Sequence, residues 1–216
     1  MKAAVLANGD WDADWGSREL AQVDVLICAD GGGNSALQAG RIPEVLIGDL
    51  DSVSSENLEK CRRNGVIIQQ FPREKDETDL ELALEYAVKQ LQSQPPGSNS
   101  QIIWLYGAIG GRVDHLLGNM ALMLHYYKKG FSIHLKDSLH EIYLLQGRDI
   151  LKGCPGQELS ILPITEAARV TTKGLYYPLK GEVLKQDSTR GISNVFAEEE
   201  AVVEVDEGIV MLVLLS

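Results

Sequence analysis

The strongest constraint on the fold is an alternation of short apolar runs with amphipathic stretches through the first 138 residues. Each apolar run is short enough for one buried strand, and the runs lie at residues 2–8, 24–29, 45–48, 66–71, 101–106 and 131–136. Helix-like stretches follow most of them, as at 35–39 and 55–63. This order is typical of a doubly wound, mostly parallel sheet, so we expect an α/β fold for this half of the chain.

Two carboxylates follow the third apolar run, in the segment Val45-Leu-Ile-Gly-Asp-Leu-Asp-Ser52. Gly48 and the serines after it indicate a strand, an acidic turn and a helix start, and α/β proteins bind ligands at such strand ends. Held about 5 Å apart at an effective dielectric near 20, Asp49 and Asp51 would repel each other by roughly 3 kcal/mol, which favours a cation between them. Oxygen ligands suit Mg²⁺, although a solvated acidic loop has the same pattern.

Acidic residues also follow the fourth run, in Asp76-Glu-Thr-Asp79. Thr78 and Glu81 have the spacing of a helix capping box, which places Asp79 in the first turn of a helix and Asp76 just before it. One reading is that both acids only complement the helix dipole. Their position at the strand exit next after Asp49 favours a single acidic pocket instead.

Glycines follow two of the other runs, in Asp30-Gly-Gly-Gly-Asn34 and in the segment from Gly107 to His115. Glycines between a strand and a helix allow backbone N–H groups to approach a phosphate, although a tight turn has the same composition. In the second segment, Arg112 offers a planar group suited to phosphate. Asp114 fits a simple helix cap, and His115 taken alone fits a surface residue.

Local patterns give three further expectations for this half of the chain. Residues 8–16 are predicted to form a loop, whose acids Asp10, Asp12 and Asp14 lack the distal Glu of a calcium loop. Residues 94–100 are predicted to form a surface loop. The helix after Arg112 is predicted to bury one face, made of Val113, Leu116, Leu117, Met120, Leu124 and Tyr127.

The second half of the chain lacks helical spacing after Ser138. Short apolar or alternating runs take over, at residues 141–146, 158–162, 168–172, 201–205 and 208–215. This pattern predicts a small antiparallel β-sandwich, with one domain at 1–138 and a second at 139–216. About eighty residues make a thin core, which favours packing against another surface.

Composition excludes several kinds of partner. A net charge of −11 would be repelled by nucleic acid or an anionic membrane, so we expect neither. The apolar runs at residues 1–8 and 208–216 are too short for a signal peptide and a membrane span, respectively. Cys28, Cys61 and Cys154 match neither a disulfide framework nor a zinc site, which indicates a reducing cytoplasm.

Taken together, five motifs resemble the thiamine pyrophosphokinase (thiamine diphosphokinase) family in identity, order and spacing. They are Ala29-Asp-Gly-Gly-Gly-Asn34, Gly48-Asp-Leu-Asp-Ser52, Asp76-Glu-Thr-Asp79, Gly110-Gly-Arg-Val-Asp-His115 and Gly191-Ile-Ser-Asn194. The resemblance implies Mg²⁺-dependent transfer of pyrophosphate from ATP to the hydroxyl of thiamine, giving thiamine diphosphate and AMP. It also implies a homodimer with its active site between the catalytic domain of one subunit and the β domain of the other.

The resemblance further implies a role for each motif residue. It assigns the metal to Asp49, Asp51 and Asp79, with Asp30, Asp76 and Asp114 completing the acidic pocket. The carboxylates expected to serve catalysis are Asp49, Asp51, Asp76, Asp79 and Asp114. Residues 1–138 are expected to bind ATP, through Asp30, Gly31, Gly32, Asn34, Gly110, Gly111, Arg112 and His115. Residues 139–216 are expected to bind thiamine through Ser193 and Asn194, whose side chains supply donors and acceptors for an aminopyrimidine.

Two questions stay open at the level of sequence. The family usually has a Trp shortly after its Ser-Asn motif and this chain has none there, which leaves Phe196, Tyr176 and Tyr177 as candidates to stack on thiamine. The rival functions are a phosphohydrolase acting through Asp49 and Asp51, and a non-catalytic sensor of thiamine diphosphate. The hydrolase family in question places its Asp-x-Asp motif on the first strand, whereas here the motif follows the third.

Overall fold

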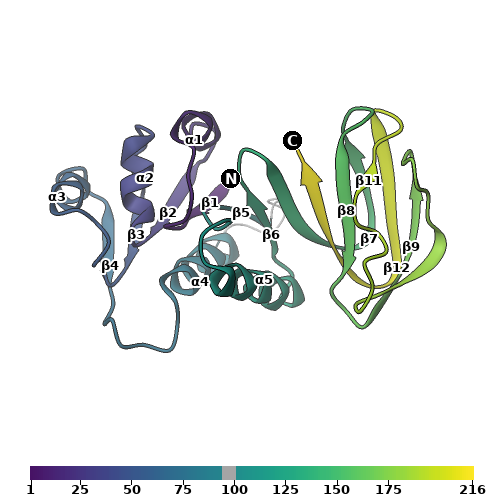
Figure 1. Ribbon diagram of the computed structural model, residues 1–216. Coiled ribbons are helices and arrows are strands. Elements are labelled where there is room, and N and C mark those ends of the chain that lie inside the picture. The colour runs from purple at the N-terminus through teal and green to yellow at the C-terminus, as the bar shows by residue number, and fades with distance from the viewer. Residues whose placement is uncertain (94–100) are drawn as a thin grey trace. The chain divides into compact units, whose positions relative to one another are not determined.

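The computed structural model describes residues 1–93 and 101–216, and the chain divides into two compact units, Met1–Ser138 and Leu139–Ser216 (Figure 1). The surface loop predicted at 94–100 lies outside the described residues. One hydrophobic cluster is built from side chains of the first unit and another from side chains of the second. Each unit therefore has a core of its own.

In the part of the first unit that the structure describes, six parallel strands lie in the order β6-β5-β1-β2-β3-β4. Their bounds are β1 (Ala3–Leu6), β2 (Val25–Ala29), β3 (Val45–Gly48), β4 (Ile67–Gln70), β5 (Ile102–Tyr106) and β6 (Ser132–Lys136). β1 pairs with β2 on one side and β5 on the other, so the strand order reverses between β1 and β5. The predicted α/β fold is confirmed, and this reversal is the place where such sheets bind ligands.

Among the described residues, five helices cover the two faces of this sheet. They are α1 (Ala13–Leu20), α2 (Gly32–Gln38), α3 (Ser55–Arg63), α4 (Asp79–Gln92) and α5 (Val113–Lys128). In Figure 1, α1, α2 and α3 lie on one side of the strands, and α4 and α5 lie on the other. The hydroxyl of Thr78 accepts a hydrogen bond from the backbone N–H of Glu81, as expected at the start of α4.

Two helices begin where the sequence predicted loops. The stretch 8–16 was predicted to be a loop, but α1 begins at Ala13 because a carboxylate oxygen of Asp12 accepts from the N–H of Trp15. The second helix begins at Gly32 rather than at residue 35. A Cβ atom on Gly32 would lie 2.1 Å from the carbonyl oxygen of Leu6, so glycine lets the helix pack directly on β1.

The predicted buried face of α5 was wrong. None of its six apolar residues is fully buried, and Val113 and Leu117 are exposed. The helix buries Met123 and Tyr126 instead and packs against β6. Apolar residues lie on more than one side of this helix, so their spacing alone does not select the face that meets the sheet.

The second unit consists of antiparallel strands. They are β7 (His140–Lys152), β8 (Glu158–Pro163), β9 (Ala167–Lys173), β10 (Lys180–Lys185), β11 (Asn194–Val195) and β12 (Glu200–Leu215). β12 pairs with β7 on both sides of a bulge near Gly208, with β9 before the bulge and with β8 after it. The predicted antiparallel fold is confirmed, although the runs 201–205 and 208–215 form one strand instead of two.

Candidate active site

Loops from four strands meet at the carboxyl edge of the parallel sheet. The N–H of Gly9, after β1, donates to the carbonyl oxygen of Gly107, after β5, at 2.7 Å. A Cβ atom on Gly31, after β2, would lie 2.2 Å from the side chain of Asn8. The N–H of Ser52, after β3, donates to a carboxylate oxygen of Asp30 at 3.3 Å. The loops that follow β1, β2, β3 and β5 are thereby gathered at one edge of the sheet.

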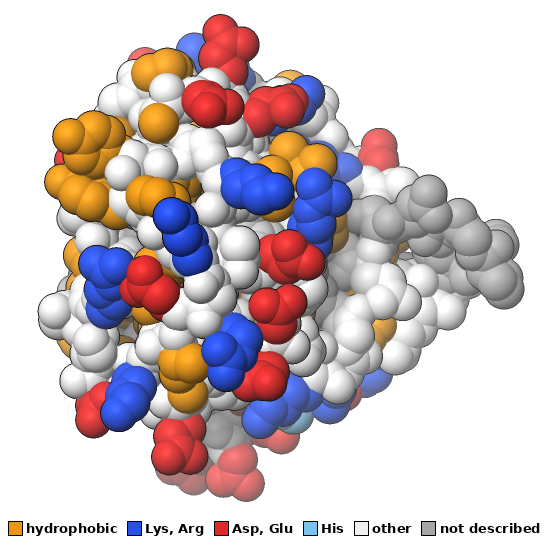
Figure 2. All heavy atoms as spheres, turned by 90° about the vertical axis from the view of Figure 1, so that its right-hand side faces the viewer, with side chains coloured by type: hydrophobic (Ala, Val, Ile, Leu, Met, Phe, Trp, Pro, Cys, Tyr) orange, Lys and Arg blue, Asp and Glu red, His pale blue; other side chains and the backbone are white. Residues whose placement is uncertain are grey.

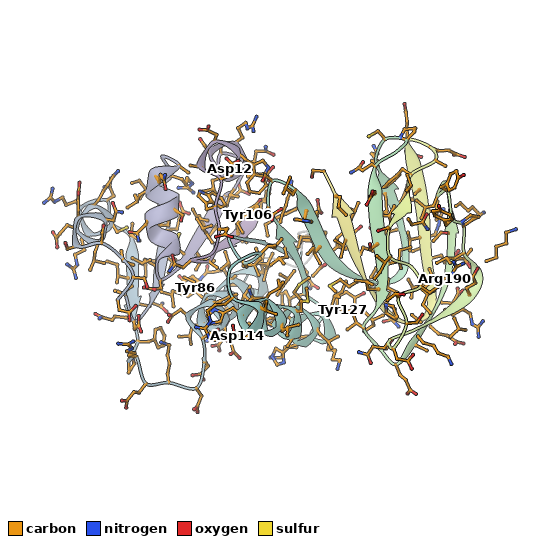
Figure 3. The ribbon with its side chains drawn as sticks, in the orientation of Figure 1. Asp12, Tyr86, Tyr106, Asp114, Tyr127 and Arg190 are labelled. Atoms are coloured by element: carbon orange, nitrogen blue, oxygen red, sulfur yellow. The ribbon has the colours of Figure 1, made fainter. Side chains whose placement is uncertain are left out.

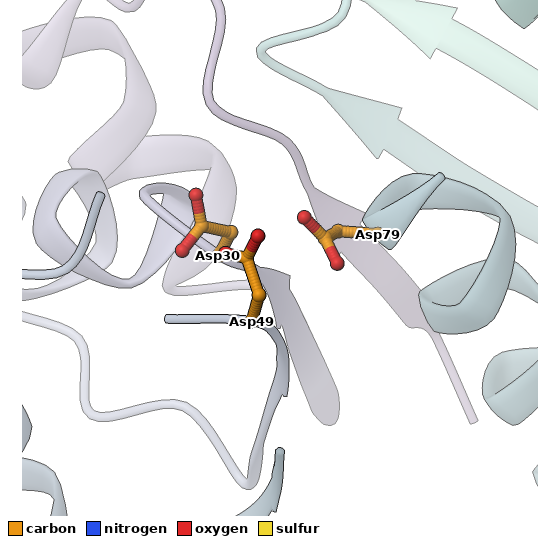
Figure 4. Close-up of side chains that lie close together, drawn as sticks. All are labelled: Asp30, Asp49 and Asp79. Carbon is orange, nitrogen blue, oxygen red and sulfur yellow. The ribbon is translucent and has the colours of Figure 1, made fainter. Parts of the chain in front are cut away.

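Three carboxylates converge at this edge: Asp30, Asp49 and Asp79 (Figure 4). One oxygen from each lies within 4.8 Å of the others. Asp30 follows β2, Asp49 follows β3, and Asp79 begins α4, so three separate elements supply the group. An array of oxygen atoms of this kind is a suitable ligand set for a hard divalent cation.

One oxygen of the Asp79 carboxylate lies against a lysine side chain. This oxygen, Oδ1, is buried and accepts no well-oriented hydrogen bond in the described part of the chain. The Lys75 ammonium group nevertheless lies 3.0 Å from that atom, in an ion pair whose side chains are 12% exposed for Lys75 and 24% for Asp79. Lys75 therefore already places a positive charge at this oxygen, since charge attraction at 3.0 Å does not depend on angle.

The turn after β3 separates the two carboxylates that the sequence placed together. Leu50 has a φ of 67° and Gly48 has a φ of 150°, backbone values that residues with a side chain rarely adopt. Leu50 is buried in the core, which holds this strained conformation in place. The turn carries Asp49 into the carboxylate group, whereas Asp51 is half-exposed and lies 3.8 Å from the guanidinium of Arg73.

The observed carboxylate group therefore differs from the predicted metal set of Asp49, Asp51 and Asp79. In the described residues Asp30 takes the place expected for Asp51. Asp30 has φ 45°, a left-handed conformation that Asp tolerates, and its side chain is almost fully buried beside the acidic loop. Sequence reasoning had placed Asp30 in the pocket but not among the ligands.

Two other predicted catalytic carboxylates lie outside this group. Asp76 is exposed on the segment that leads into α4. Asp114, labelled in Figure 3, accepts two hydrogen bonds from Arg112, at 3.1 Å and 2.5 Å. The hydrogen bond from Arg112 lowers the pKa of Asp114 to about 2. The phosphate-binding group expected at Arg112 is thus paired with Asp114 in this structure, and His115 beside them is exposed.

Asn34 links the glycine segment to the acidic loop. Its Nδ2 donates to the carbonyl oxygen of Ser52 at 2.8 Å, and its Oδ1 accepts from the N–H of Ser54 and from Nδ2 of Asn57. Both ends of the Asn34 amide are therefore bonded within the protein. The amide holds the loop that carries Asp49.

Sequence reasoning did not foresee three contacts at this edge, made by Lys75, Gly48 and Gly110. A Cβ atom on Gly48 would lie 3.1 Å from the Asp79 carboxylate, and one on Gly110 would lie 2.4 Å from Oδ2 of Asp10. Only the four-residue spacing from Lys75 to Asp79 was visible in the sequence. The other two contacts join distant segments and leave no local signal.

A second candidate site lies in the C-terminal unit. A cavity of about 310 Å³ is lined by Tyr177, Leu179, Arg190, Gly191, Ile192, Ser193 and Asn194. Both residues predicted to bind thiamine are therefore on its wall. Figure 2, which views the right-hand side of Figure 1, shows hydrophobic side chains exposed among acidic and basic ones. The exposed hydrophobic residues of this unit include Tyr176, Tyr177 and Ile192.

The two predicted thiamine ligands have different surroundings. Ser193 is exposed, with φ 53°, and its N–H donates to the hydroxyl of Ser160. Asn194 is buried, and its amide bonds to the backbone of Tyr177 and Val195. Oδ1 of Asn194 is thus taken by two backbone N–H groups of the protein itself.

Fold and sites together place the chain in the class of α/β enzymes that bind ligands at the carboxyl edge of a parallel sheet. Two family models match most of its length. "Thiamin pyrophosphokinase, catalytic domain" matches residues 17–135, and "Thiamin pyrophosphokinase, vitamin B1 binding domain" matches residues 140–210. The chain therefore belongs to the thiamine pyrophosphokinase family and is an enzyme.

Individual relatives agree with this assignment. A thiamine pyrophosphokinase of Bacillus subtilis (strain 168) is 32% identical over 190 residues, covering 87% of this chain and 85% of that protein. Thiamine pyrophosphokinase 3 of Oryza sativa subsp. japonica is 29% identical over 205 residues, covering 85% and 75%. A crystal structure of thiamine pyrophosphokinase from Bacillus subtilis has a TM-score of 0.86 at 26% identity, covering 100% of this chain and 99% of that one.

Proposed function

We propose that the enzyme transfers the pyrophosphoryl group of ATP to the hydroxyl oxygen of thiamine. A bond forms between that oxygen and the β-phosphorus, the bond from the β-phosphorus to the oxygen shared with the α-phosphorus breaks, and AMP leaves. The observation that carries the proposal is the group formed by Asp30, Asp49 and Asp79 at the carboxyl edge of the sheet. It lies within the part of the chain that matches the catalytic family model.

The cofactor proposed for this group is Mg²⁺. Three carboxylates from separate elements supply the oxygen ligands that a small, hard cation prefers. Asp30, Asp49 and Asp79 would hold it, with Asp51 as an exposed carboxylate close by in the loop. When bound, the metal would neutralise phosphate oxygens that gain negative charge during transfer.

The residues of the chain would contribute positioning and local charge. Backbone N–H groups of Gly31, Gly32, Gly110 and Gly111 border the edge where the loops meet and are proposed to face the phosphates of ATP. Arg112 is proposed to exchange Asp114 for a phosphate oxygen, since it already forms a two-bond contact with an anion. One carboxylate of the pocket, with Asp76 and Asp114 among the candidates, accepts the hydroxyl proton of thiamine.

Thiamine is proposed to bind in the cavity of the C-terminal unit, beside Ser193 and Asn194. We further propose a homodimer, because a unit of this size has a thin core and exposes apolar side chains such as Ile150 and Val183.

Among the described residues no helix is long and apolar enough to cross a membrane. The cytoplasmic setting stays part of the proposal, supported by the free thiols of Cys28, Cys61 and Cys154.

The test is to incubate the protein with ATP, Mg²⁺ and thiamine and to identify the products by ³¹P nuclear magnetic resonance. We expect AMP and thiamine diphosphate in equal amounts. Stoichiometric ADP would indicate an ordinary kinase instead. Phosphate release without thiamine would favour the hydrolase, and tight binding of thiamine diphosphate without turnover would favour the sensor.

A further inference from the structure

We propose that Tyr177 is the aromatic side chain that contacts a ring of thiamine, and that Asn194 is the residue that positions it. The inference rests on the proposed thiamine site in the C-terminal unit. It follows from comparing the aromatic side chains near the Ser-Asn motif and from the hydrogen bonds that hold one of them.

Burial and position separate the three aromatic candidates. Phe196 is 1% exposed and belongs to the hydrophobic core of its unit, so its ring is not available to a ligand. Tyr176 is 68% exposed and does not line the cavity. Tyr177 lines the cavity and is 55% exposed, which leaves a large part of its surface free for contact. Tyr177 is thus the aromatic residue of the three that is both accessible and on the cavity wall.

The side-chain amide of Asn194 bonds to both the backbone N–H and the backbone carbonyl of Tyr177. Oδ1 of Asn194 accepts from the N–H of Tyr177 at 3.1 Å, and Nδ2 donates to the carbonyl oxygen of Tyr177 at 2.8 Å. Oδ1 also accepts from the N–H of Val195 at 2.9 Å. Two hydrogen bonds with a buried amide thus fix the backbone of the residue that carries the ring, and the third ties the same amide to Val195.

The same loop is fixed again two residues later, at Leu179. The N–H of Leu179 donates to the hydroxyl of Thr172 at 2.8 Å, and its carbonyl oxygen accepts from the N–H of Thr172 at 2.9 Å. Pro178 lies between the two anchors and restricts the backbone of Tyr177 to extended conformations. A ring mounted on such a segment loses little freedom on binding, which favours affinity.

The opposite wall of the cavity is equally well supported. The N–H of Ile161 donates to the carbonyl oxygen of Gly191 at 2.9 Å, and a Cβ atom on Gly191 would lie 2.3 Å from the carbonyl oxygen of Ile161. Arg190, labelled in Figure 3, also lines the cavity, and its charge is paired with Glu182 through hydrogen bonds of 3.0 to 3.3 Å. This pairing lowers the repulsion that an unpaired Arg would exert on the cationic thiazolium ring.

Thiamine offers two rings that suit a tyrosine face. Its aminopyrimidine is aromatic, and its thiazolium carries a positive charge that is attracted to the face of an aromatic ring. The chain has no tryptophan in the second unit, so a tyrosine on the cavity wall supplies the contact. Ser193 then remains as an exposed hydroxyl on the same wall.

The experiment measures steady-state kinetics with each substrate varied in turn, together with thiamine binding by calorimetry without ATP. Tyr177→Ala is expected to raise the thiamine KM and dissociation constant roughly five- to fiftyfold and to leave the ATP KM within about twofold. Tyr177→Phe keeps the ring and is expected to stay within about threefold of wild type. Tyr176→Ala removes a ring that lies edge-on to that of Tyr177, with centroids 4.9 Å apart, and is expected to raise the thiamine KM by less than Tyr177→Ala and to leave the ATP KM within about twofold.

The role of Asn194 is tested by combining changes. If Asn194 acts through Tyr177, Asn194→Ala raises the thiamine KM in the wild-type background but adds little in the Tyr177→Ala background. If the double variant instead raises the thiamine KM by the product of the two single-variant factors, the positioning role is overturned, because the two residues then contact thiamine independently. Asn194→Asp keeps both acceptor contacts, and it replaces Asn194→Ala if circular dichroism shows that the latter is unfolded.

Three results would overturn the assignment of Tyr177. They are an unchanged thiamine affinity in Tyr177→Ala, an equal loss in Tyr176→Ala, and a loss in Tyr177→Phe as large as in Tyr177→Ala. Each can occur while the wild-type protein still forms AMP and thiamine diphosphate, so each leaves the proposed function standing. If the wild-type protein forms neither product, the proposed function fails, and the binding measurement still decides the role of Tyr177.

Discussion

The ammonium group of Lys75 lies 3.0 Å from Oδ1 of Asp79, the residue that begins α4 and completes the carboxylate group. A lysine side chain therefore supplies positive charge beside three carboxylates. Since the pair is only partly accessible to water, it is screened less than a surface ion pair. In the metal-free protein, Lys75 supplies part of the positive charge that a bound cation would otherwise bring to the three carboxylates.

Lys75→Met is expected to lower the stability of the metal-free protein by about 1 to 2 kcal/mol, because three carboxylates then face one another with less compensation. Millimolar Mg²⁺ should restore most of the loss, since it supplies the missing charge. The measurement is thermal unfolding with a chelator and with Mg²⁺. Lys89→Met removes an exposed pair of the same spacing with Glu85 and should cost no more than about 0.5 kcal/mol, with no Mg²⁺ effect. Equal behaviour of the two variants would contradict the argument.

Asp49→Asn is expected to keep the fold and to lower kcat roughly 100-fold or more. Removing one anionic ligand weakens Mg²⁺ and leaves the charge of ATP without compensation. The measurement is kcat over a range of Mg²⁺ concentrations, with Glu56→Gln, an exposed acid in the first turn of α3, as control. A variant with most of the wild-type activity at ordinary Mg²⁺ would remove Asp49 from the proposed metal site.

Gly48→Ala is expected to reduce both stability and activity. Its Cβ atom would lie 3.0 Å from Cβ of Asp30 and 3.1 Å from the Asp79 carboxylate, at a φ of 150° that alanine rarely adopts. We expect a loss of about 1 to 3 kcal/mol in unfolding free energy, together with weaker Mg²⁺ binding. Gly118→Ala, on an open face of α5, should instead stabilise the protein by about 0.5 to 1 kcal/mol. Chemical denaturation of both variants checks the contrast.

Arg112→Met is expected to raise the pKa of Asp114 from about 2 toward its ordinary value of 3.8. A carboxyl group with a lowered pKa in the folded state contributes stability above its ordinary pKa and loses that contribution as pH falls toward 2. The wild-type protein should therefore show this loss between about pH 4 and pH 2, and the variant should not. Carbon nuclear magnetic resonance of Asp114 measures the shift, with Arg62→Met, which disturbs a distant exposed pair, as control. A titration of Asp114 near 3.8 in the wild-type protein would contradict the pairing.

The sequence alone determined which residues form the parallel sheet and which acids lie at its edge. Apolar runs flanked by glycine or aspartate marked the strands, and carboxyl ends of parallel strands share one edge, so Asp49 and Asp79 were expected near one another. The family resemblance added Asp30 to the same pocket. Capping chemistry is equally local, which is why Thr78 was identified as the start of α4. These signals act within a few residues and survive without tertiary context.

Only the tertiary structure decided which of these residues come into contact. The left-handed Leu50, held by core packing, turns Asp51 away and leaves Asp30 in its place, and no local pattern predicts a strained leucine. Glycines disfavour helices, yet the first turn of α2 contains them. The reason is that only glycine fits against the carbonyl oxygen of Leu6. Asn194 bonds to Tyr177 across 17 residues. Such contacts join distant segments, and their energies depend on the folded core. No local sequence pattern therefore predicts them, and they can be identified only once the fold is known.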